Sequence, residues 1–419
     1  MANPPRSHSS PKPVVVIALC AVVATLTIAA DWPQFRGPER TGVGEATGLA
    51  DAWPEGGPPV RWQIETLGEG YGSVAVMDDV LYVQGTAGGQ SVVFALSADD
   101  GRTLWRRALG PRRDQDQGAG PRSTPTVVGD GLYVLNEAGE LAYLDRRTGE
   151  GRWQFNILER FDSSNIYWSV SESPLVDAER VYVMPGGRGG SIAAVDRKTG
   201  ETVWRSRELT DAASYSSLVF TEVGGVRAIA GFTQEAGVGV RASDGKLLWR
   251  YEAPANGTAN AAMPVAGDGL VFYTSSYGVG GGAVRVDGQG SSEEAWFQSS
   301  LQNHHGGVAL YGDHLYGFFG PALGCVELAS GEIAWRARSV GKGSLAIADG
   351  KLFLLSERHQ MGLAEATPEG YREGGRFEIE DRGWPSWAYP VVSDGTLYVR
   401  NWDQLTAYDV RAEGAAGNP

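Results

Sequence analysis

The stretch AVDRKTGETVW, residues 194 to 204, is the unit from which most of the 419-residue chain is built. Apolar residues end one strand, Asp196 opens a turn, Gly200 closes it, and a second strand carries Trp204. Glycine supplies the positive φ that such a turn requires, and an aspartate side chain bonds to its own backbone there. The stretch therefore predicts a β-hairpin whose second strand carries a tryptophan.

The same pattern recurs along the chain with a spacing of about 40 to 50 residues, which in β-rich sequence is typical of propeller blades. Full copies end at Trp105, Trp153, Trp249 and Trp335, and a degraded copy, GSSEEAWF, surrounds Trp296. A regular repeat of this kind allows one closed ring to use nearly the whole chain. No long segment has the apolar spacing of a helix, so we predict an all-β fold.

A second repeated signal gives the number of blades. It consists of a strand, a short turn and a strand that in most copies carries an aromatic residue, and it occurs eight times. Turns such as those at 130–131, 349–350 and 394–395 are Asp-Gly pairs between alternating apolar strands, which favours tight hairpins. We therefore predict an eight-bladed β-propeller of four-stranded antiparallel blades.

The ends of the repeat region predict how the ring closes. The stretch VRWQIETLG, residues 60–68, resembles the last strand of a blade whose earlier strands are missing, and residues 387–410 supply three strands without a fourth. We expect the N-terminal strand with Trp62 to complete the C-terminal blade, because this leaves no open sheet edge. In the seventh repeat, Phe377 stands where the other repeats have tryptophan.

The flanking segments complete the predicted domain organisation. Residues 31–59, which we call the strap, are rich in Pro and Gly, yet Trp32, Phe35 and Trp53 give them side chains to bury. We expect the strap to be ordered, the propeller to occupy residues 60–411, and residues 412–419 to form a flexible tail.

The N-terminus has the pattern of an export signal. Arg6 and Lys12 precede an apolar run, residues 14–28, and Ala29-Ala30 offers a small-residue cleavage point. The run is short for a membrane span of roughly twenty residues. We predict a signal peptide over residues 1–30 and a periplasmic or extracellular protein without stable membrane insertion, with an uncleaved anchor as the alternative.

Charge and cysteine content exclude several functional classes. The net charge is −14, so a broad basic face for nucleic acid or anionic lipid is not expected. The only cysteines are Cys20, in the predicted leader, and Cys325. Cysteine-rich metal sites and attached c-type haem are therefore excluded.

The recurring A-x-D-x-x-T-G-x-x-x-W pattern resembles the tryptophan-docking repeat of the PQQ-binding-like β-propellers. That superfamily includes quinoprotein alcohol dehydrogenases and the BamB-type outer-membrane assembly protein. The opening DWPQFRGP, with NHHGG at 303–307 and VGKGSL at 340–345, resembles an exported branch whose members mostly have no established activity. The resemblance covers about residues 31–411 and implies a scaffold shared by enzymes and binding proteins.

Candidate functional residues lie in the loops that precede the first strand of each repeat, since these loops line one mouth of the central channel. The loops contain charged, amide and aromatic side chains that a structural turn does not require, and an apolar wall with a few convergent polar groups suits a ligand. The candidate ligand-binding residues are Arg122, Trp168, Glu172, Tyr215, Asn260, His304, His305, Lys342, Trp384 and Trp387.

The resemblance to quinoprotein alcohol dehydrogenases implies a more specific arrangement. Those enzymes hold calcium and PQQ at this mouth, and Glu172, Asn260 and Lys342 fall in the matching blades, the first two as calcium ligands. The sixth blade, however, has His304-His305 in place of the Asp base, and neither an adjacent Cys pair nor the floor Trp is present. On a strand, these adjacent histidines would point to opposite faces, which predicts no zinc site.

Two functions of different class follow. The first is an exported, non-catalytic propeller that binds a small molecule, a glycan or a protein partner through its channel mouth. The second is a PQQ-dependent alcohol or sugar dehydrogenase. A channel histidine that acts as a general base also stays open.

Overall fold

The computed structural model of the protein describes residues 1–2, 4 and 30–413. The predicted signal peptide, except for residues 1, 2, 4 and 30, and most of the predicted tail lie outside the described residues. Within the described part of the chain, no helix has the length and apolar character needed to cross a membrane.

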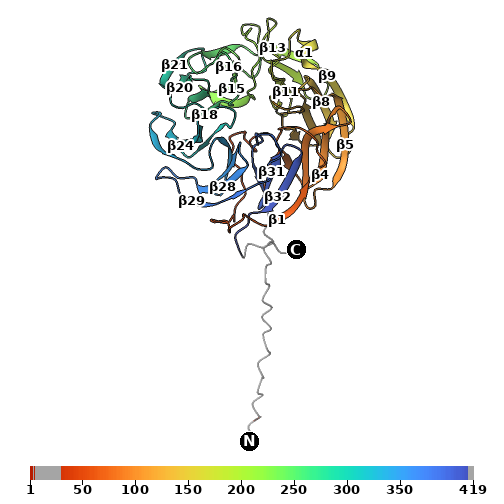
Figure 1. Ribbon diagram of the computed structural model, residues 1–419, viewed down its shortest axis with the longest axis vertical. Helices are drawn as coiled ribbons and strands as arrows, with labels where there is room; N and C mark the ends of the chain where they lie inside the picture. Colours follow the sequence, from red (N-terminus) through yellow and green to blue (C-terminus); the bar gives the residue numbers. More distant parts are fainter. Residues whose placement is uncertain (3, 5–29, 414–419) are drawn as a thin grey trace.

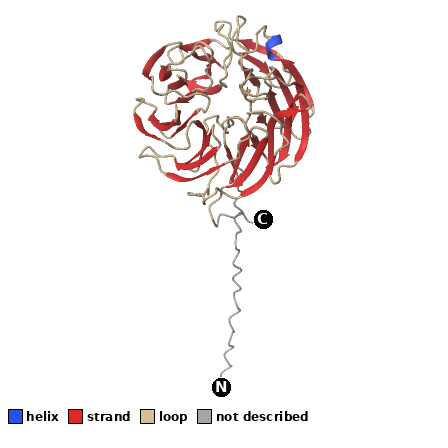
Figure 2. Cartoon of the chain, viewed as in Figure 1, coloured by secondary structure: helices blue, strands red, loops and turns tan. Residues whose placement is uncertain are grey.

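Eight sheets of four antiparallel strands stand in a ring (Figures 1 and 2). The first strand of each blade is innermost, and several pairs of first strands from neighbouring blades contact one another, such as β18 with β22 and β22 with β26. One short helix, α1 (Ile157–Arg160), follows the second blade. The prediction of an all-β, eight-bladed propeller is confirmed.

Each blade contributes one strand to each of four positions, from the centre of the ring to its rim. The innermost strands are β2 (Ala75–Met77), β6 (Thr126–Val128), β10 (Leu175–Val176), β14 (Val219–Val223), β18 (Val265–Gly267), β22 (Val308–Tyr311), β26 (Gly343–Ala348) and β30 (Val391–Ser393). The second strands are β3 (Val80–Ala87), β7 (Gly131–Leu135), β11 (Arg180–Val183), β15 (Val226–Phe232), β19 (Leu270–Ser275), β23 (His314–Phe319), β27 (Lys351–Ser356) and β31 (Thr396–Asn401). The third strands are β4 (Gln90–Ser97), β8 (Glu140–Asp145), β12 (Ala193–Asp196), β16 (Gly237–Arg241), β20 (Gly280–Val286), β24 (Ala322–Glu327), β28 (Gln360–Glu365) and β32 (Gln404–Asp409). The outer strands are β5 (Thr103–Pro111), β9 (Gly151–Asn156), β13 (Thr202–Arg205), β17 (Leu247–Tyr251), β21 (Ser292–Gln298), β25 (Ile333–Ala337), β29 (Glu373–Glu378) and β1 (Val60–Ile64).

The last blade is closed by the N-terminal strand, as predicted. Strand β1 pairs antiparallel with β32, and Trp62 lies opposite Ala407. The two ends of the propeller therefore share one sheet, which leaves the third strand of the last blade paired on both sides.

The repeated tryptophans dock each blade onto the next. Trp62 Nε1 donates to the carbonyl oxygen of Ala98 at 2.8 Å, and Trp105 Nε1 donates to that of Arg146 at 3.1 Å. The same bond joins Trp153 to Arg197, Trp204 to Ala242, Trp296 to Leu328 and Trp335 to Thr367. Each bond satisfies a buried or half-buried indole N–H at a blade interface.

The glycine of the repeat serves the same contact. A Cβ atom on Gly101 would lie 2.8 Å from Cε3 of Trp62, and one on Gly149 would lie 2.6 Å from Cε3 of Trp105. Both glycines also have positive φ. The turn glycine of one blade is therefore the platform for the tryptophan of the preceding blade, which explains why the two residues recur together.

Two blades depart from this pattern. The first is the fourth blade, whose neighbour, the fifth blade, carries the degraded repeat. Trp249 of the fourth blade donates to the hydroxyl of Tyr273 at 2.9 Å instead of to a backbone carbonyl oxygen. In the seventh blade, Phe377 on β29 packs edge-on against Trp53 of the strap, with ring centroids 5.4 Å apart. Strap and propeller thus share one hydrophobic core.

The first part of the strap crosses the centre of the ring. Trp32 is buried and forms an isolated antiparallel bridge with Val76 of β2. Gly44 donates its N–H to the carbonyl oxygen of Ile347 on β26, at 2.8 Å. Since β2 and β26 belong to different blades, the strap ties separate parts of the ring together.

Two buried arginines hold the strap in this position. Arg36 donates to the carbonyl oxygen of Val308 on β22. Arg40 donates to the carbonyl oxygens of Leu218, at 2.7 Å, and Ser173, at 2.8 Å, which precede β14 and β10. The guanidinium groups therefore satisfy inner carbonyl oxygens of three blades, and the strap fills the middle of the ring.

Candidate functional site

A cavity of about 210 Å³ lies at the channel mouth, where the loops that precede the innermost strands converge. We call it the cup. It is lined by Phe35, Tyr71, Ser73, Gln117, Arg122, Trp168, Ser171, Tyr215, Ser217, Ala259, Ala261, Tyr277, His304, His305, Trp387 and Tyr389. Phe35 belongs to the strap, so the segment that fills the ring also contributes to the wall of the cup.

The structure brings together most of the residues predicted from the sequence. Six of the ten line the cup, namely Arg122, Trp168, Tyr215, His304, His305 and Trp387. Lys342 lies beside them, in contact with His304. Glu172 and Asn260 are buried and do not line the cup. Trp384 also lies outside the lining and stacks on Trp402.

The aromatic side chains of the cup support one another in pairs. The ring centroids of Tyr71 and Trp387 are 4.8 Å apart, and those of Trp168 and Tyr215 are 5.7 Å apart. Pairs at such spacing contribute about 0.5–1.5 kcal/mol beyond the area they bury. The walls are therefore pre-formed surfaces on which a flat ring can pack.

Arg122 is positioned by π contacts and backbone carbonyls. Its guanidinium carbon lies 4.9 Å from the centre of the Tyr71 ring and 5.9 Å from that of Trp387. It donates to the carbonyl oxygens of Gly118, at 3.0 Å, and Gln117, at 3.3 Å. Burial lowers the pKa of Arg122, but an arginine remains protonated in proteins. A positive charge therefore stands in an aromatic wall.

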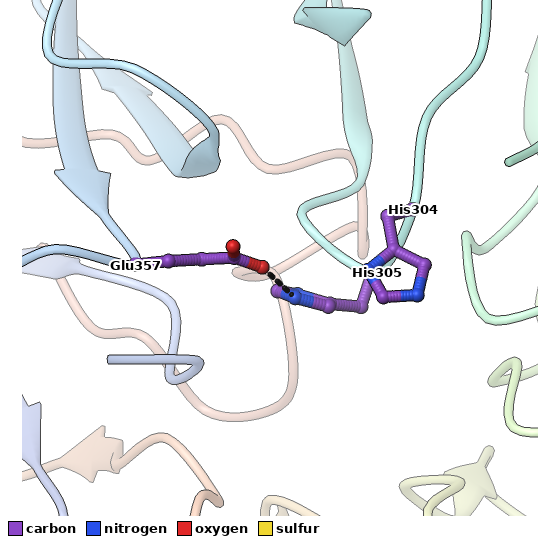
Figure 3. Close-up of side chains that lie close together, drawn as sticks. All are labelled: His304, His305 and Glu357. Atoms are coloured by element: carbon purple, nitrogen blue, oxygen red, sulfur yellow. Dashed lines mark hydrogen bonds and ion pairs between the residues drawn. The ribbon is translucent and has the colours of Figure 1, made fainter. Parts of the chain in front are cut away.

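Glu357 organises the opposite side of the cup. Its Oε1 accepts from His305 Nε2 at 2.6 Å, Lys342 Nζ at 2.9 Å and Trp387 Nε1 at 3.2 Å (Figure 3 shows the first bond). Burial alone raises the pKa of Glu357, but the donors from His305 and Lys342 outweigh it and lower the pKa to about 2. The carboxylate is therefore ionised and neutralises Lys342 at physiological pH.

The same lysine sets the state of His304. Burial, with smaller contributions from His305 and Lys342, lowers the pKa of His304 to about 3, so its ring is neutral. Lys342 Nζ lies 2.8 Å from Nδ1, and an ammonium can only donate, so Nδ1 accepts. Nε2 then carries the hydrogen and donates to the Tyr277 hydroxyl at 2.8 Å. The hydroxyl hydrogen of Tyr277 is left for another acceptor.

The two adjacent histidines do not lie as the sequence predicted. They precede β22 in a loop rather than on a strand, and their ring centroids are only 4.7 Å apart, so the opposite-face prediction is wrong. Possible ligand atoms of His304, His305 and Glu357 lie within 4.8 Å of one another (Figure 3). Lys342 Nζ touches His304 and Glu357, so an ammonium already stands where a metal ion would bind.

The predicted calcium ligands do not fit a calcium ion. Oδ1 of Asn260 accepts from the N–H and the Nδ2 of Asn256, at 3.0 and 2.9 Å, which uses both of its lone pairs. Glu172 accepts from the N–H of Met184 at 2.7 Å, and burial raises its pKa to about 8. Oε2 of Glu172 is buried without a partner, but the buried cation Arg40 acts on the same carboxyl and would repel a dication there. With the oxygen of Asn260 already saturated, the two residues do not offer calcium the several free oxygen ligands it requires.

Other residues that line or support the cup were not singled out from the sequence. Tyr71 and Tyr389 lie in loops that precede innermost strands, among the loops expected at the mouth. Tyr277 and Glu357 lie instead in the hairpins between second and third strands. These hairpins lie at the same end of a blade as the loops that precede the innermost strands. An aromatic or acidic residue at the tip of such a hairpin was therefore the sequence signal for these two residues.

Comparison with known proteins agrees with the architecture. The family model described as outer membrane protein assembly factor BamB matches residues 57–170 and 164–337. The chain is 32% identical over 140 residues to such a factor from Kangiella koreensis, which covers 33% of this chain and 32% of that protein. It is 28% identical over 259 residues to one from Burkholderia pseudomallei, which covers 57% of this chain and 63% of that protein. The chain thus matches less than two thirds of the length of either relative.

Solved structures show the same fold. Quinohemoprotein alcohol dehydrogenase from Comamonas testosteroni superposes with a TM-score of 0.63 at 13% identity, over 93% of this chain and 82% of that one. BamB from Moraxella catarrhalis superposes with a TM-score of 0.60 at 14% identity, over 83% and 98%. Because the family model matches more than half of its residues, the chain belongs to the family of PQQ-like β-propellers described as outer membrane protein assembly factor BamB.

Proposed function

We propose that the protein is an exported, non-catalytic propeller that binds a ligand in the cup. The observation that carries this proposal is the cup itself, a pre-formed cavity of about 210 Å³ with aromatic walls and one charged lining residue. The ligand is a small molecule, a sugar residue of a glycan, or a side chain presented by a protein partner. The name of the matched family supports a partner in an assembly process.

A quinone-dependent dehydrogenase is less well supported by the geometry. The side-chain oxygen of Asn260 is saturated by Asn256, and the buried cation Arg40 acts on Glu172, so the pair does not offer calcium a set of free oxygen ligands. Cys325, the one cysteine in the described part of the chain, is buried and has no partner to form a cysteine pair. Two neutral histidines stand in place of the expected carboxylate base.

The proposal is tested by filling the cup. Ala261 lines it, and Ala261→Trp introduces a large ring into the cavity. Ala334→Trp places the same ring on the exposed outer strand β25 and serves as the control. Ligand-observed NMR with a library of aromatic acids, amides and sugars should give hits with the wild type and with Ala334→Trp. Those hits should vanish with Ala261→Trp. Hits that persist in Ala261→Trp would place the binding site elsewhere and contradict the proposal.

A further inference from the structure

The cup has a charge opposite to that of the whole protein. The chain carries a net charge of −14, yet no Asp, Glu or Lys is among the residues that line the cup. His304 and His305 are held neutral by burial. Arg122 is therefore the one charged group in the lining at neutral pH. A cavity of this kind favours an anion over a cation or a neutral molecule.

Arg122 is also available to an anion. Among the described residues it makes no ion pair with a carboxylate, and both of its hydrogen bonds use Nη2. Its Nε is buried without a partner. Lys342 is different, because Glu357 already neutralises it. A guanidinium has five N–H donors, and a carboxylate that accepts two of them would compensate a desolvated charge.

The geometry limits the number of charges on the ligand. Glu137 and Asp116 act on Arg122 only from a distance, without an ion pair. One cation that has no direct carboxylate partner matches one anionic group, and a second carboxylate would enter a low-dielectric cavity without a partner. The rings around Arg122, including Tyr71 and Trp387, offer flat apolar surfaces beside the charge. We propose that the cup binds a flat aromatic ring that bears a single carboxylate, with the carboxylate on Arg122 and the ring against the aromatic walls. This inference rests on the proposed function and specifies its ligand class.

A matched pair of probes tests the inference. 2-Naphthoate and 2-naphthamide have the same rings and nearly the same shape, but only the first is charged. Their dissociation constants are measured by titration calorimetry with the purified protein and with Arg122→Met, which keeps a long side chain without the charge. Arg106→Met, on the exposed face of the outer strand β5, is the control for loss of an arginine. Thermal unfolding of each variant verifies folding.

We expect the wild type and Arg106→Met to bind 2-naphthoate at least roughly tenfold more tightly than 2-naphthamide, as one charge-assisted contact allows. Arg122→Met should lose that preference and keep its affinity for 2-naphthamide. Equal affinity of the wild type for both probes, or an unchanged preference in Arg122→Met, would overturn the ligand class. The proposed function would survive that result if Ala261→Trp still abolished binding of both. Failure of the wild type to bind either probe would also overturn the ligand class. The proposed function is decided separately, by whether the library screen gives hits that Ala261→Trp abolishes.

Discussion

The indole Nε1 of Trp62 lies 2.8 Å from the carbonyl oxygen of Ala98, and this bond joins the strand that closes the ring to the first blade. Trp62 belongs to β1, which completes the last blade, whereas Ala98 follows β4 of the first blade. One side chain therefore links the two ends of the propeller. The stability of the ring should depend on it more than on its neighbours in the same strand.

Replacement of Trp62 by alanine tests this link. We expect Trp62→Ala to lower the free energy of unfolding by about 3–5 kcal/mol, because a large buried ring and a buried bond are lost together. Val60→Ala, whose side chain is 56% exposed on the same strand, should change it by less than about 0.5 kcal/mol. Urea unfolding measures both. Similar values for the two variants would mean that β1 does not carry the closure.

The glycine of the repeat gives a second test of blade docking. Gly101 and Gly88 both have positive φ, but a Cβ on Gly101 would lie 2.8 Å from Trp62, whereas one on Gly88 meets nothing within 4 Å. The backbone conformation destabilises both alanine variants by about 1–2 kcal/mol. We expect Gly101→Ala to lose a further 1–3 kcal/mol, roughly, from overpacking. If urea unfolding gave equal losses of unfolding free energy for the two variants, Gly101 would not be needed for the docking of Trp62.

Glu172 should make stability depend on pH. Burial raises its pKa from the ordinary value of 4.5 to about 8, and the hydrogen bond from Met184 and the charge of Arg40 oppose this only in part. The folded protein keeps a proton that the unfolded chain releases, so the contribution of Glu172 to stability falls as pH rises from about 4.5 to about 8. Glutamine does not ionise. We therefore expect Glu172→Gln to gain stability relative to the wild type between pH 5 and pH 8. A difference that does not change with pH would contradict the raised pKa.

Lys342 should keep metal ions out of the cup wall. Its ammonium touches His304 and Glu357, which with His305 form a compact set of three possible ligands. We expect Lys342→Ala to bind Co²⁺ with the visible absorption of a low-coordinate nitrogen and oxygen site, since three ligands suffice when one position stays open. Lys342→Arg retains the cation and should not bind it. Stoichiometric Co²⁺ binding by the wild type would show that the ammonium does not occupy the site.

The fold could be predicted because its signal is local and repeated. Gly200 and Trp204 lie in one hairpin, and the contacts that such residues make with neighbouring blades are repeated at most of the blade interfaces. Phe377 could be placed by its position in the repeat alone. The path of Arg36 and Arg40 through the ring could not, because bonds to carbonyl oxygens more than a hundred residues away leave no pattern in a single sequence.

The site could be predicted only in part, for a related reason. Arg122 and Trp387 lie in loops whose position follows from the blade topology, so the sequence places them at the mouth. Glu172 and Asn260 are in equivalent loops, but they serve the backbone of Met184 and Asn256 instead of the cavity. Loop position alone does not say whether a side chain points into the cup or behind its wall. Glu357 was missed because its role depends on three hydrogen-bond partners, His305, Lys342 and Trp387, whose positions in the sequence show no regular spacing relative to it.

The most direct test of the central claim is a crystal structure of the protein with a hit from the library screen. We predict electron density for the ligand in the cup, between the Tyr71–Trp387 pair and the Trp168–Tyr215 pair, with a polar atom within hydrogen-bonding distance of Arg122. Ligand density only on the outer strands or at the strap, with an empty cup at saturating concentration, would contradict the account.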